Sequence, residues 1–503
     1  MKSAVFSRRD TSVIYSVAAL LSIMLSAWIA FRETVINPDA ICYLLSAQEI
    51  GVSGLSSAMH ICAQSKWPFY SLLIYGFVQL THFAYSMSAF MIDAVFTAIS
   101  VVTFIAIIRE LGGSRRVLWL AAFVILSMHE FNAIRQYIIR DHGFWAFYLV
   151  SVLLLVRFVR KPKWMTAIGW SVSLLVATLF RIEGAIFLLA LPMIMFFEVD
   201  KTSFRHRFFS FLTLNIVSLV LGGLLAAYVI FHSQSLDKFG RLSELQMQAQ
   251  HVFSLIFNHY LQTRNALLQY VLPNDAAKDA GLLLFLTMTI WYLIKLLENI
   301  SLGFAVVVVY AWWNKAASIS RSAMFVLLAY LLVNVLITLG FFAEHYFLSK
   351  RYLIALSLIL MMWVPFGLNQ LISQWQHGKQ RFLMLLVTLL IFISTLGGIV
   401  NFGYSKTYIR NAGDWLAENV PQQASLYAND YQLMYYSRHF GSQIFRKLDE
   451  YRGTNIHAEG KWQQYDYVAL RVGHDDVNQM SLSPLHVFMN KRGDRVNIYK
   501  ITH

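Results

Sequence analysis

Long apolar runs, separated by short polar connections, fill most of the chain from residue 11 to residue 400. Many approach the roughly 20 residues that an α-helix needs to cross a bilayer, and none shows the ten-residue alternation of a membrane β-strand. Helices are therefore the spanning elements. We predict about eleven spans, at residues 11–31, 86–108, 117–133, 143–158, 165–180, 182–197, 208–231, 297–313, 322–341, 352–367 and 382–401.

Lysine and arginine are concentrated in alternate connections between these runs. The positive-inside rule places such connections on the cytoplasmic side, so the N-terminus is predicted inside and the C-terminus outside. The first run is longer than a signal-peptide core and no A-x-A site follows it, which predicts a retained anchor. The basic set is Lys2, Arg8, Arg9, Arg109, Arg115, Arg116, Arg157, Arg160, Lys161, Lys163, Lys201, Arg205, Arg207, Lys315, Arg321, Lys379 and Arg381.

Composition supports the membrane assignment and changes the meaning of the net charge. Charged residues make up only 14% of the 503 residues, against about 25% in soluble domains. The formal net charge of +14 would suit nucleic acid, but its clustering in alternate connections is a topology signal instead. We expect no nucleic-acid partner.

Three long segments are predicted to lie outside. Residues 32–85 contain short apolar stretches that resemble helices lying in the membrane interface. Residues 232–296 begin polar and end in "GLLLFLTMTIWYLI", which lies on the membrane or forms the outer half of a span. Residues 404–503 read as a small soluble α/β domain with a hairpin turning at Arg492–Gly493–Asp494. The predicted domains are therefore 1–403, membrane-embedded, and 404–503, outside.

Both cysteines, Cys42 and Cys62, fall in the first outside segment. An oxidising compartment permits a disulfide between them. Their spacing equally allows two thiols buried among apolar side chains, because no spacing rule pairs them.

Ionisable residues at the outer ends of spans are site candidates, because a charge near lipid must be paired or face water. Asp39 is a candidate general base or carbonyl anchor, or else lies at the start of an interfacial helix whose cap is Asn37 or Asp39, with Pro38 in the first turn. Lys66, in "SKWPFY", is a candidate phosphate ligand or a lysine that snorkels to the interface. Arg140 and Asp141 are adjacent in "RQYIIRDHG" and need not neutralise each other.

Two further outer connections carry charge. "FRIEG" places Arg181 and Glu183 between apolar runs with almost no loop, so both must lie near the bilayer surface. "EHYFLSKRY" contributes His345, Lys350 and Arg351, and a Lys-Arg pair on the outside favours an anionic partner such as phosphate. Asp93 lies inside an apolar run and is interpreted as an acid satisfied by helix packing.

This convergence of acids and bases suits transfer from a lipid-linked phosphate donor. Cations would hold the departing phosphate while a carboxylate takes the proton of an acceptor hydroxyl or amine. The chain has no glycine-rich nucleotide cradle. No His or Cys cluster has ligand spacing, so no metal site is predicted, although the acids leave a divalent ion open.

The sequence resembles integral-membrane glycosyltransferases of the GT-C fold, which include protein O-mannosyltransferases and the bacterial aminoarabinose transferases of lipid A. The resemblance rests on "NPDAICYLLSAQEI", "KWPFY", "RDHG", "FRIEG", "SKRYL" and the tail "AGDWLAENVPQQASLYANDYQLMYYS". It departs where Ala40 follows Asp39 in place of a second acid, and where Trp67 replaces a proline.

The resemblance implies an all-α polytopic enzyme in a bacterial inner membrane. It implies an inverting transferase that moves a sugar from a polyprenyl-phosphate donor to a lipid, glycan or protein acceptor. Asp39 would be the base and Asp141 a second acid, with Lys66, Arg140 and Arg351 as phosphate ligands. Lys350 joins these ligands through its place beside Arg351. Tyr70, Arg181, Glu183 and His345 complete the candidates.

Three other functions fit parts of the pattern. A transporter or flippase would carry mid-membrane charges, broken helices and repeated halves, whereas most charges here sit at outer ends. A non-catalytic envelope assembly protein would need the outer segments only for binding. A ligase for lipid-linked polymers would differ in its much larger donor.

Overall fold

The apolar runs form helices in the computed structural model, which describes residues 8–32, 35–197, 203–232, 241–400, 402–452, 460–476 and 482–501. The chain divides into two compact units. We call Met1–Leu25, Ala94–Ile134 and Arg140–Val400 the helical unit. We call Ser26–Asp93, Arg135–Ile139 and Asn401–His503 the mixed unit.

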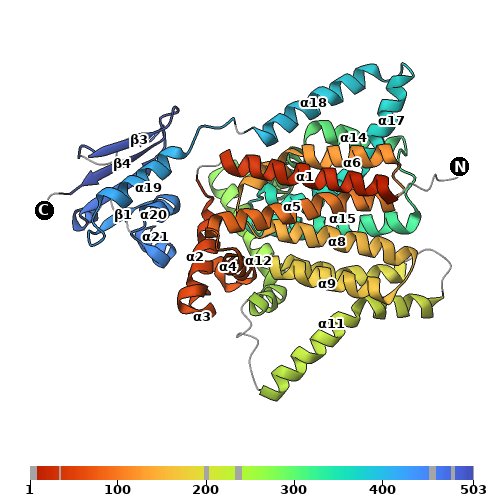
Figure 1. Ribbon diagram of the computed structural model, residues 1–503, viewed down its shortest axis with the longest axis horizontal. Helices are drawn as coiled ribbons and strands as arrows, with labels where there is room; N and C mark the ends of the chain where they lie inside the picture. Colours follow the sequence, from red (N-terminus) through yellow and green to blue (C-terminus); the bar gives the residue numbers. More distant parts are fainter. Residues whose placement is uncertain are drawn as a thin grey trace. The chain divides into compact units, whose positions relative to one another are not determined.

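The helical unit is built from long helices joined by short connections (Figure 1). Two of them, α1 and α5, also contain residues that belong to the mixed unit. Its helices are α1 (Arg8–Arg32), α5 (Tyr85–Glu110), α6 (Arg115–Ser127), α7 (His129–Ala133), α8 (Asp141–Arg160), α9 (Trp164–Phe180), α10 (Glu183–Ala190), η3 (Leu191–Phe197), α11 (Phe204–His232), α12 (Arg241–Tyr270), η5 (Asn274–Asp279), α13 (Ala280–Ile300), α14 (Leu302–Trp313), α15 (Arg321–His345), α16 (Lys350–Leu360), η6 (Met361–Trp363), α17 (Val364–Gln376) and α18 (Arg381–Ile399).

The helices confirm the predicted all-α polytopic membrane fold. Within the described residues, eight helices are long and apolar enough to cross a membrane, or nine if the bent pair of α6 with the segment His129–Gln136 is one span. That pair bends by 54°. The predicted spans 165–180 and 182–197 coincide with shorter apolar helices, and a further short apolar helix, Leu302–Trp313, covers only part of the predicted span 297–313.

One predicted span needs correction. The segment 297–313 is not one helix, because Ser301 has a φ of 70° and separates α13 from α14. The stretch "GLLLFLTMTIWYLI" therefore belongs to α13, which ends at Ile300, and does not continue into α14 as the outer half of one span. Residues 233–240 of the predicted outer segment 232–296 lie outside the described residues.

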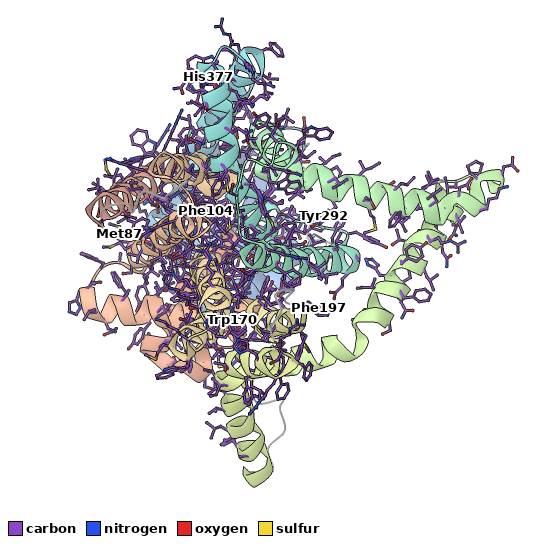
Figure 2. The ribbon with its side chains drawn as sticks, turned by 90° about the vertical axis from the view of Figure 1, so that its right-hand side faces the viewer. Met87, Phe104, Trp170, Phe197, Tyr292 and His377 are labelled. Atoms are coloured by element: carbon purple, nitrogen blue, oxygen red, sulfur yellow. A yellow bond between two sulfur atoms is a disulfide. The ribbon has the colours of Figure 1, made fainter. Side chains whose placement is uncertain are left out.

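Buried polar side chains hold the centre of the helical unit together. Trp170 of α9 donates its indole N–H to the Tyr330 hydroxyl of α15 at 3.1 Å. The same hydroxyl shares a 2.8 Å hydrogen bond with Ser151 of α8. Trp170 and Phe104 lie inside the bundle in the view of Figure 2, and both are fully buried. Such interhelical bonds stabilise helix packing where no water competes.

The mixed unit contains a four-stranded sheet in the order β1-β2-β4-β3. The strands are β1 (Leu426–Ala428), β2 (Tyr467–Val472), β3 (His486–Met489) and β4 (Arg495–Lys500). β1 pairs parallel to β2, and the other pairs are antiparallel. Figure 1 shows the sheet beside α19 (Thr407–Asn419), α20 (Tyr431–Ser437) and α21 (Ile444–Arg452).

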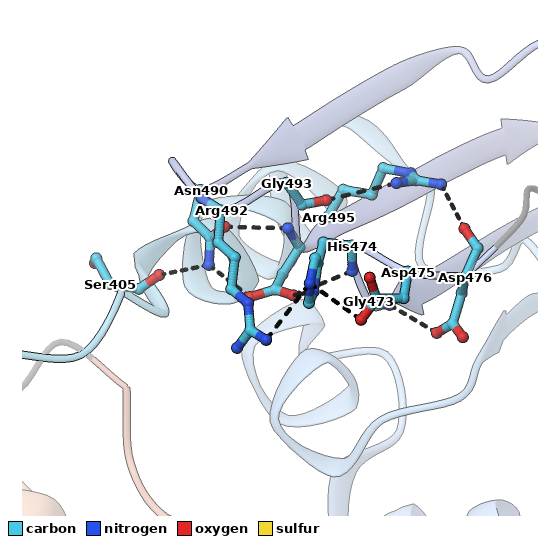
Figure 3. Close-up of polar contacts among 10 residues, drawn as sticks. Ser405, Gly473, His474, Asp475, Asp476, Asn490, Arg492, Gly493 and Arg495 are labelled. Carbon is cyan, nitrogen blue, oxygen red and sulfur yellow. Dashed lines mark hydrogen bonds and ion pairs between the residues drawn. The ribbon is translucent and has the colours of Figure 1, made fainter.

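The hairpin between β3 and β4 turns where the sequence predicted. Gly493 adopts a φ of +99°, a conformation that side chains with a Cβ rarely tolerate. The Asn490 side chain accepts hydrogen bonds from the backbone N–H groups of Arg492 and Asp494, at 2.9 and 3.1 Å (Figure 3). Local turn chemistry therefore sets this hairpin.

The first outside segment also belongs to the mixed unit. It forms α2 (Pro38–Ser53), α3 (Leu55–Ala58), η1 (Ala63–Lys66) and α4 (Phe69–Thr81). Ile41 and Leu45 of α2 lie in the same apolar core as the buried residues of the sheet. The Tyr436 hydroxyl accepts the backbone N–H of Ile36 at 3.0 Å. The C-terminal strands therefore share their core with the helix that follows the first predicted span.

Candidate active site

Asp39 lies in the first turn of α2, in the mixed unit. Asn37 occupies the N-cap position, and its side chain is engaged by the backbone of Ile138. Asp39 is half-buried and accepts a 3.5 Å hydrogen bond from the Gln64 side chain. The N-cap is thus Asn37 and not Asp39. The amino end of α2 nevertheless favours a negative charge at Asp39.

A disulfide between Cys42 and Cys62 holds the neighbouring segment against α2. Cys42 comes one helical turn after Asp39, and Cys62 directly precedes η1, which contains Gln64 and Lys66. The sequence left open whether the two cysteines form a disulfide or remain buried thiols, and the structure shows the disulfide. The bond holds the segment that carries Lys66 close to the turn that carries Asp39. The side chain of Lys66 is exposed.

Alkylation should detect this disulfide directly. In SDS without reductant, a thiol reagent should leave both cysteines unlabelled, and reduction before alkylation should add two labels per chain. The chain has two cysteines and both are bonded. SDS exposes Cys42, which is fully buried in the folded protein. Labelling of either residue without reductant, read by peptide mass, would contradict the bond.

Tyr70 faces Asp93 inside the mixed unit. The buried Tyr70 hydroxyl donates to Asp93 Oδ2 at 2.8 Å, and the backbone N–H of Ile139 donates to the same oxygen at 3.4 Å. Asp93 is 3% exposed and its Oδ2 accepts two hydrogen bonds, which agrees with its interpretation as a packing acid. The carboxylate links α4 to the segment that immediately precedes Arg140.

Arg181 joins the two acids of the helical unit. It ion-pairs with Asp141 at the start of α8 and with Glu183 at the start of α10. The Arg181 side chain is 11% exposed and that of Asp141 is 6% exposed. Burial alone lowers the pKa of Arg181, but the charges of Glu183 and Asp141 outweigh it and raise the pKa. The guanidinium therefore stays charged at any physiological pH.

Two further arginines lie at this cluster. The guanidinium carbons of Arg181 and Arg351 lie 4.8 and 5.2 Å from the centre of the Tyr352 ring. Arg140 and Arg351 act electrostatically on the Asp141 carboxylate. We call Arg140, Asp141, Arg181, Glu183 and Arg351 the arginine cluster. Three guanidinium groups against two carboxylates leave one positive charge in excess, which suits a phosphate.

Lys350 and His345 have other contacts. Lys350 donates to Glu130 of α7 at 2.7 Å and lies 3.7 Å from Glu298. His345 is exposed, and its ring stacks on Phe341 with centroids 4.3 Å apart.

Glu130, which is 6% exposed, was not among the candidates predicted from the sequence. An ionisable residue inside an apolar run was the available signal.

No group of three or more His, Cys, Asp or Glu side chains within the described ranges is placed to hold a metal ion. Of the candidates, Asp39, Lys66 and Tyr70 belong to the mixed unit, whereas the arginine cluster, Lys350 and His345 belong to the helical unit.

The fold is that of GT-C membrane glycosyltransferases, as comparison with solved structures shows. An oligosaccharyltransferase from Archaeoglobus fulgidus matches with a TM-score of 0.55 and 11% identity, over 91% of this chain and 68% of that one. ArnT from Cupriavidus metallidurans, solved with undecaprenyl phosphate, matches with a TM-score of 0.55 and 12% identity, over 98% of each chain. No family model and no curated protein sequence matches the chain.

Proposed function

We propose that this protein transfers a sugar from a polyprenyl-phosphate-linked donor to a lipid, glycan or protein acceptor at the outer face of a bacterial inner membrane. The arginine cluster carries the proposal, because it gathers three cations around two acids at helix ends. Cations held in a site that excludes water stabilise a phosphate far better than solvated ones. The GT-C fold supports the same reaction class.

The proposed reaction is a single displacement that inverts the anomeric carbon. The Asp39 carboxylate takes the proton of the acceptor hydroxyl or amine as that atom attacks the sugar. The bond between the anomeric carbon and the phosphate oxygen breaks, and the electron pair leaves with the polyprenyl phosphate. Arg140 and Arg351 hold that phosphate, with Lys66 as a further ligand. Arg181 orients Asp141 and Glu183 beside them.

The proposal includes an orientation and a domain division. The basic connections lie in the cytoplasm. Residues 404–503 form a periplasmic domain whose core includes Ile41 and Leu45 of α2, and the spanning helices within residues 1–403 precede it. Lys350 is a weaker candidate phosphate ligand than Arg140 and Arg351, because the Glu130 carboxylate already neutralises its charge. His345, whose side chain is exposed, is proposed to contact the acceptor.

Donor binding tests the proposal at Arg351. Replacing Arg351 with alanine should weaken the affinity for undecaprenyl phosphate by about 1.5–3 kcal/mol, the free energy of a hydrogen bond to a charged group. Titration of the purified protein, followed by native mass spectrometry, measures the affinity. Arg321→Ala, at an exposed arginine that begins α15, is the matched control and should bind normally.

Two outcomes would count against the proposal. Unchanged affinity of a folded Arg351→Ala protein would show that Arg351 only anchors α16. If proteoliposomes that contain the wild type yield no glycosylated product from a panel of polyprenyl-phosphate sugars, but move the lipid between leaflets, the protein is a flippase. Binding without either activity would favour an assembly protein.

A further inference from the structure

A polar cavity lies at the end of the helical unit that carries its basic connections. Its volume is about 540 Å³, and the start of α1 and the ends of α5 and α8 surround it. Figure 1 shows these three helices running together toward the N-terminal end of the chain. The lining residues are Thr11, Ser12, Tyr15, Arg109, Glu110 and Arg157.

This cavity is separate from the arginine cluster. Asp141 begins α8, whereas Arg157 lies in its last turn. Sixteen residues of helix separate them by about 24 Å along the axis. None of the lining residues takes part in the proposed transfer, so the inference below does not depend on that function.

The charge balance around the cavity is positive. Glu110 accepts hydrogen bonds from Arg157 at 2.8 Å and from Arg160 at 3.4 Å, so one carboxylate serves two guanidinium groups. Arg109 is exposed and makes no hydrogen bond or ion pair within the described part of the chain. Three arginines and one glutamate leave two positive charges in excess at the opening.

The remaining lining groups are suited to an oxyanion. Thr11, Ser12 and Tyr15 each carry a hydroxyl and come from one turn and a half of α1. Hydroxyl and guanidinium donors together match the oxygens of a phosphate diester. Thr11 is 3% exposed and lines the cavity.

The surface of α1 next to the cavity favours a lipid over a free anion. On the side of α1 that carries Ser12, Ile23 lies about three helical turns farther along and is 44% exposed. An apolar side chain therefore follows the hydroxyl residues on the same side of α1. A phosphate held by Arg109 would place attached acyl chains along this side of the helix.

We propose that this cavity binds the phosphate group of an anionic glycerophospholipid, with the acyl chains lying along α1. The surrounding basic connections belong to the side that the positive-inside rule assigns to the cytoplasm. Anionic lipids of that leaflet are attracted to basic groups at the membrane surface and bind basic pockets between spanning helices. The site is thus a lipid site of the inner leaflet.

Lipid titration of the full chain in detergent tests the site. Native mass spectrometry should show phosphatidylglycerol retained and phosphatidylcholine lost at matched concentration. Arg109→Ala should weaken phosphatidylglycerol binding about fivefold, the effect of one basic residue near an anionic surface. Arg116→Ala removes the same charge from an exposed arginine near the same end that does not line the cavity, and it should leave binding nearly unchanged.

Three results would overturn the proposal. Equal losses in Arg109→Ala and Arg116→Ala would indicate diffuse charge attraction and no defined site. Equal retention of phosphatidylcholine would show that headgroup charge plays no part. Displacement of the lipid by millimolar inorganic phosphate would identify a free-anion site. Should Arg109→Ala fold poorly, Arg109→Lys keeps the charge and should retain most of the phosphatidylglycerol binding.

Discussion

Replacing Asp39 with asparagine should lower the rate of sugar transfer by about 10²-fold or more, the usual contribution of a general base. Asparagine keeps the size of the side chain and its ability to accept from Gln64, but it cannot take a proton. Expression, folding and affinity for the donor phosphate should stay close to wild type. Initial rates at saturating donor and acceptor, compared with donor titrations, separate the two effects.

The structure makes this substitution informative. Asn37 occupies the N-cap position of α2, so Asp39→Asn does not remove a helix cap. The disulfide and the Gln64 contact hold the surroundings of residue 39 in place. Glu49→Gln on the same helix is the matched control, since Glu49 accepts from Ser57 near the far end of α2. That variant should transfer sugar at nearly the wild-type rate.

Asp39→Ala completes the experiment. If asparagine supports normal transfer while alanine merely destabilises the protein, Asp39 is a structural residue and the base lies elsewhere. Asp141 would then be tested next, although its pairing with Arg181 makes it a weaker proton acceptor. Equal loss of transfer in both Asp39 variants, with intact donor binding, supports the proposed base.

Replacing Arg181 with glutamine should reduce the free energy of unfolding by about 3–5 kcal/mol, because it leaves the buried Asp141 carboxylate and the partly buried Glu183 carboxylate without their ion-pair partner. Asp141 and Glu183 begin different helices, so the connection between α9 and α10 would lose its contact with α8. Denaturant titration in mixed micelles, followed by intrinsic fluorescence, measures the change.

A combined variant distinguishes the charge from the packing. Neutralising both acids with Asp141→Asn and Glu183→Gln in the Arg181→Gln background should restore part of the lost stability, since the two acids no longer carry charges that Arg181 balanced. Recovery should be incomplete, because Arg140 and Arg351 lose the Asp141 charge. Arg410→Gln is the control: Arg410 pairs with Asp414, and both side chains are well exposed. It should cost about 1 kcal/mol or less. Comparable losses for Arg181→Gln and Arg410→Gln would show that the arginine cluster is solvated and contributes little.

Local patterns determined much of the architecture. Hydropathy alone placed helices in all the predicted membrane segments, because burial in lipid demands a continuous apolar run. Turn residues placed the β3–β4 hairpin, since the Asn490 side-chain hydrogen bonds and the Gly493 backbone conformation depend on neighbours a few residues away. The hydropathy pattern did not locate the break at Ser301, although the polar residues Lys295, Glu298 and Asn299 come shortly before it.

Contacts between distant residues were decided by the tertiary structure alone. Sequence position identified Asp141, Arg181 and Glu183 as charges near lipid, but only packing of α8 against α9 and α10 shows that one guanidinium serves both acids. Glu130 meets Lys350 across 220 positions, and no local pattern encodes that pair.

The same limit applies to the first outside segment. The sequence showed an acid, a lysine and two cysteines there and left the cysteine pairing open. The folded chain joins Cys42 to Cys62 and places Ile41 and Leu45 in the core shared with the C-terminal sheet. Hydropathy reports which residues avoid water, whereas the partner of each buried group depends on how distant segments pack, and that is a property of the whole fold.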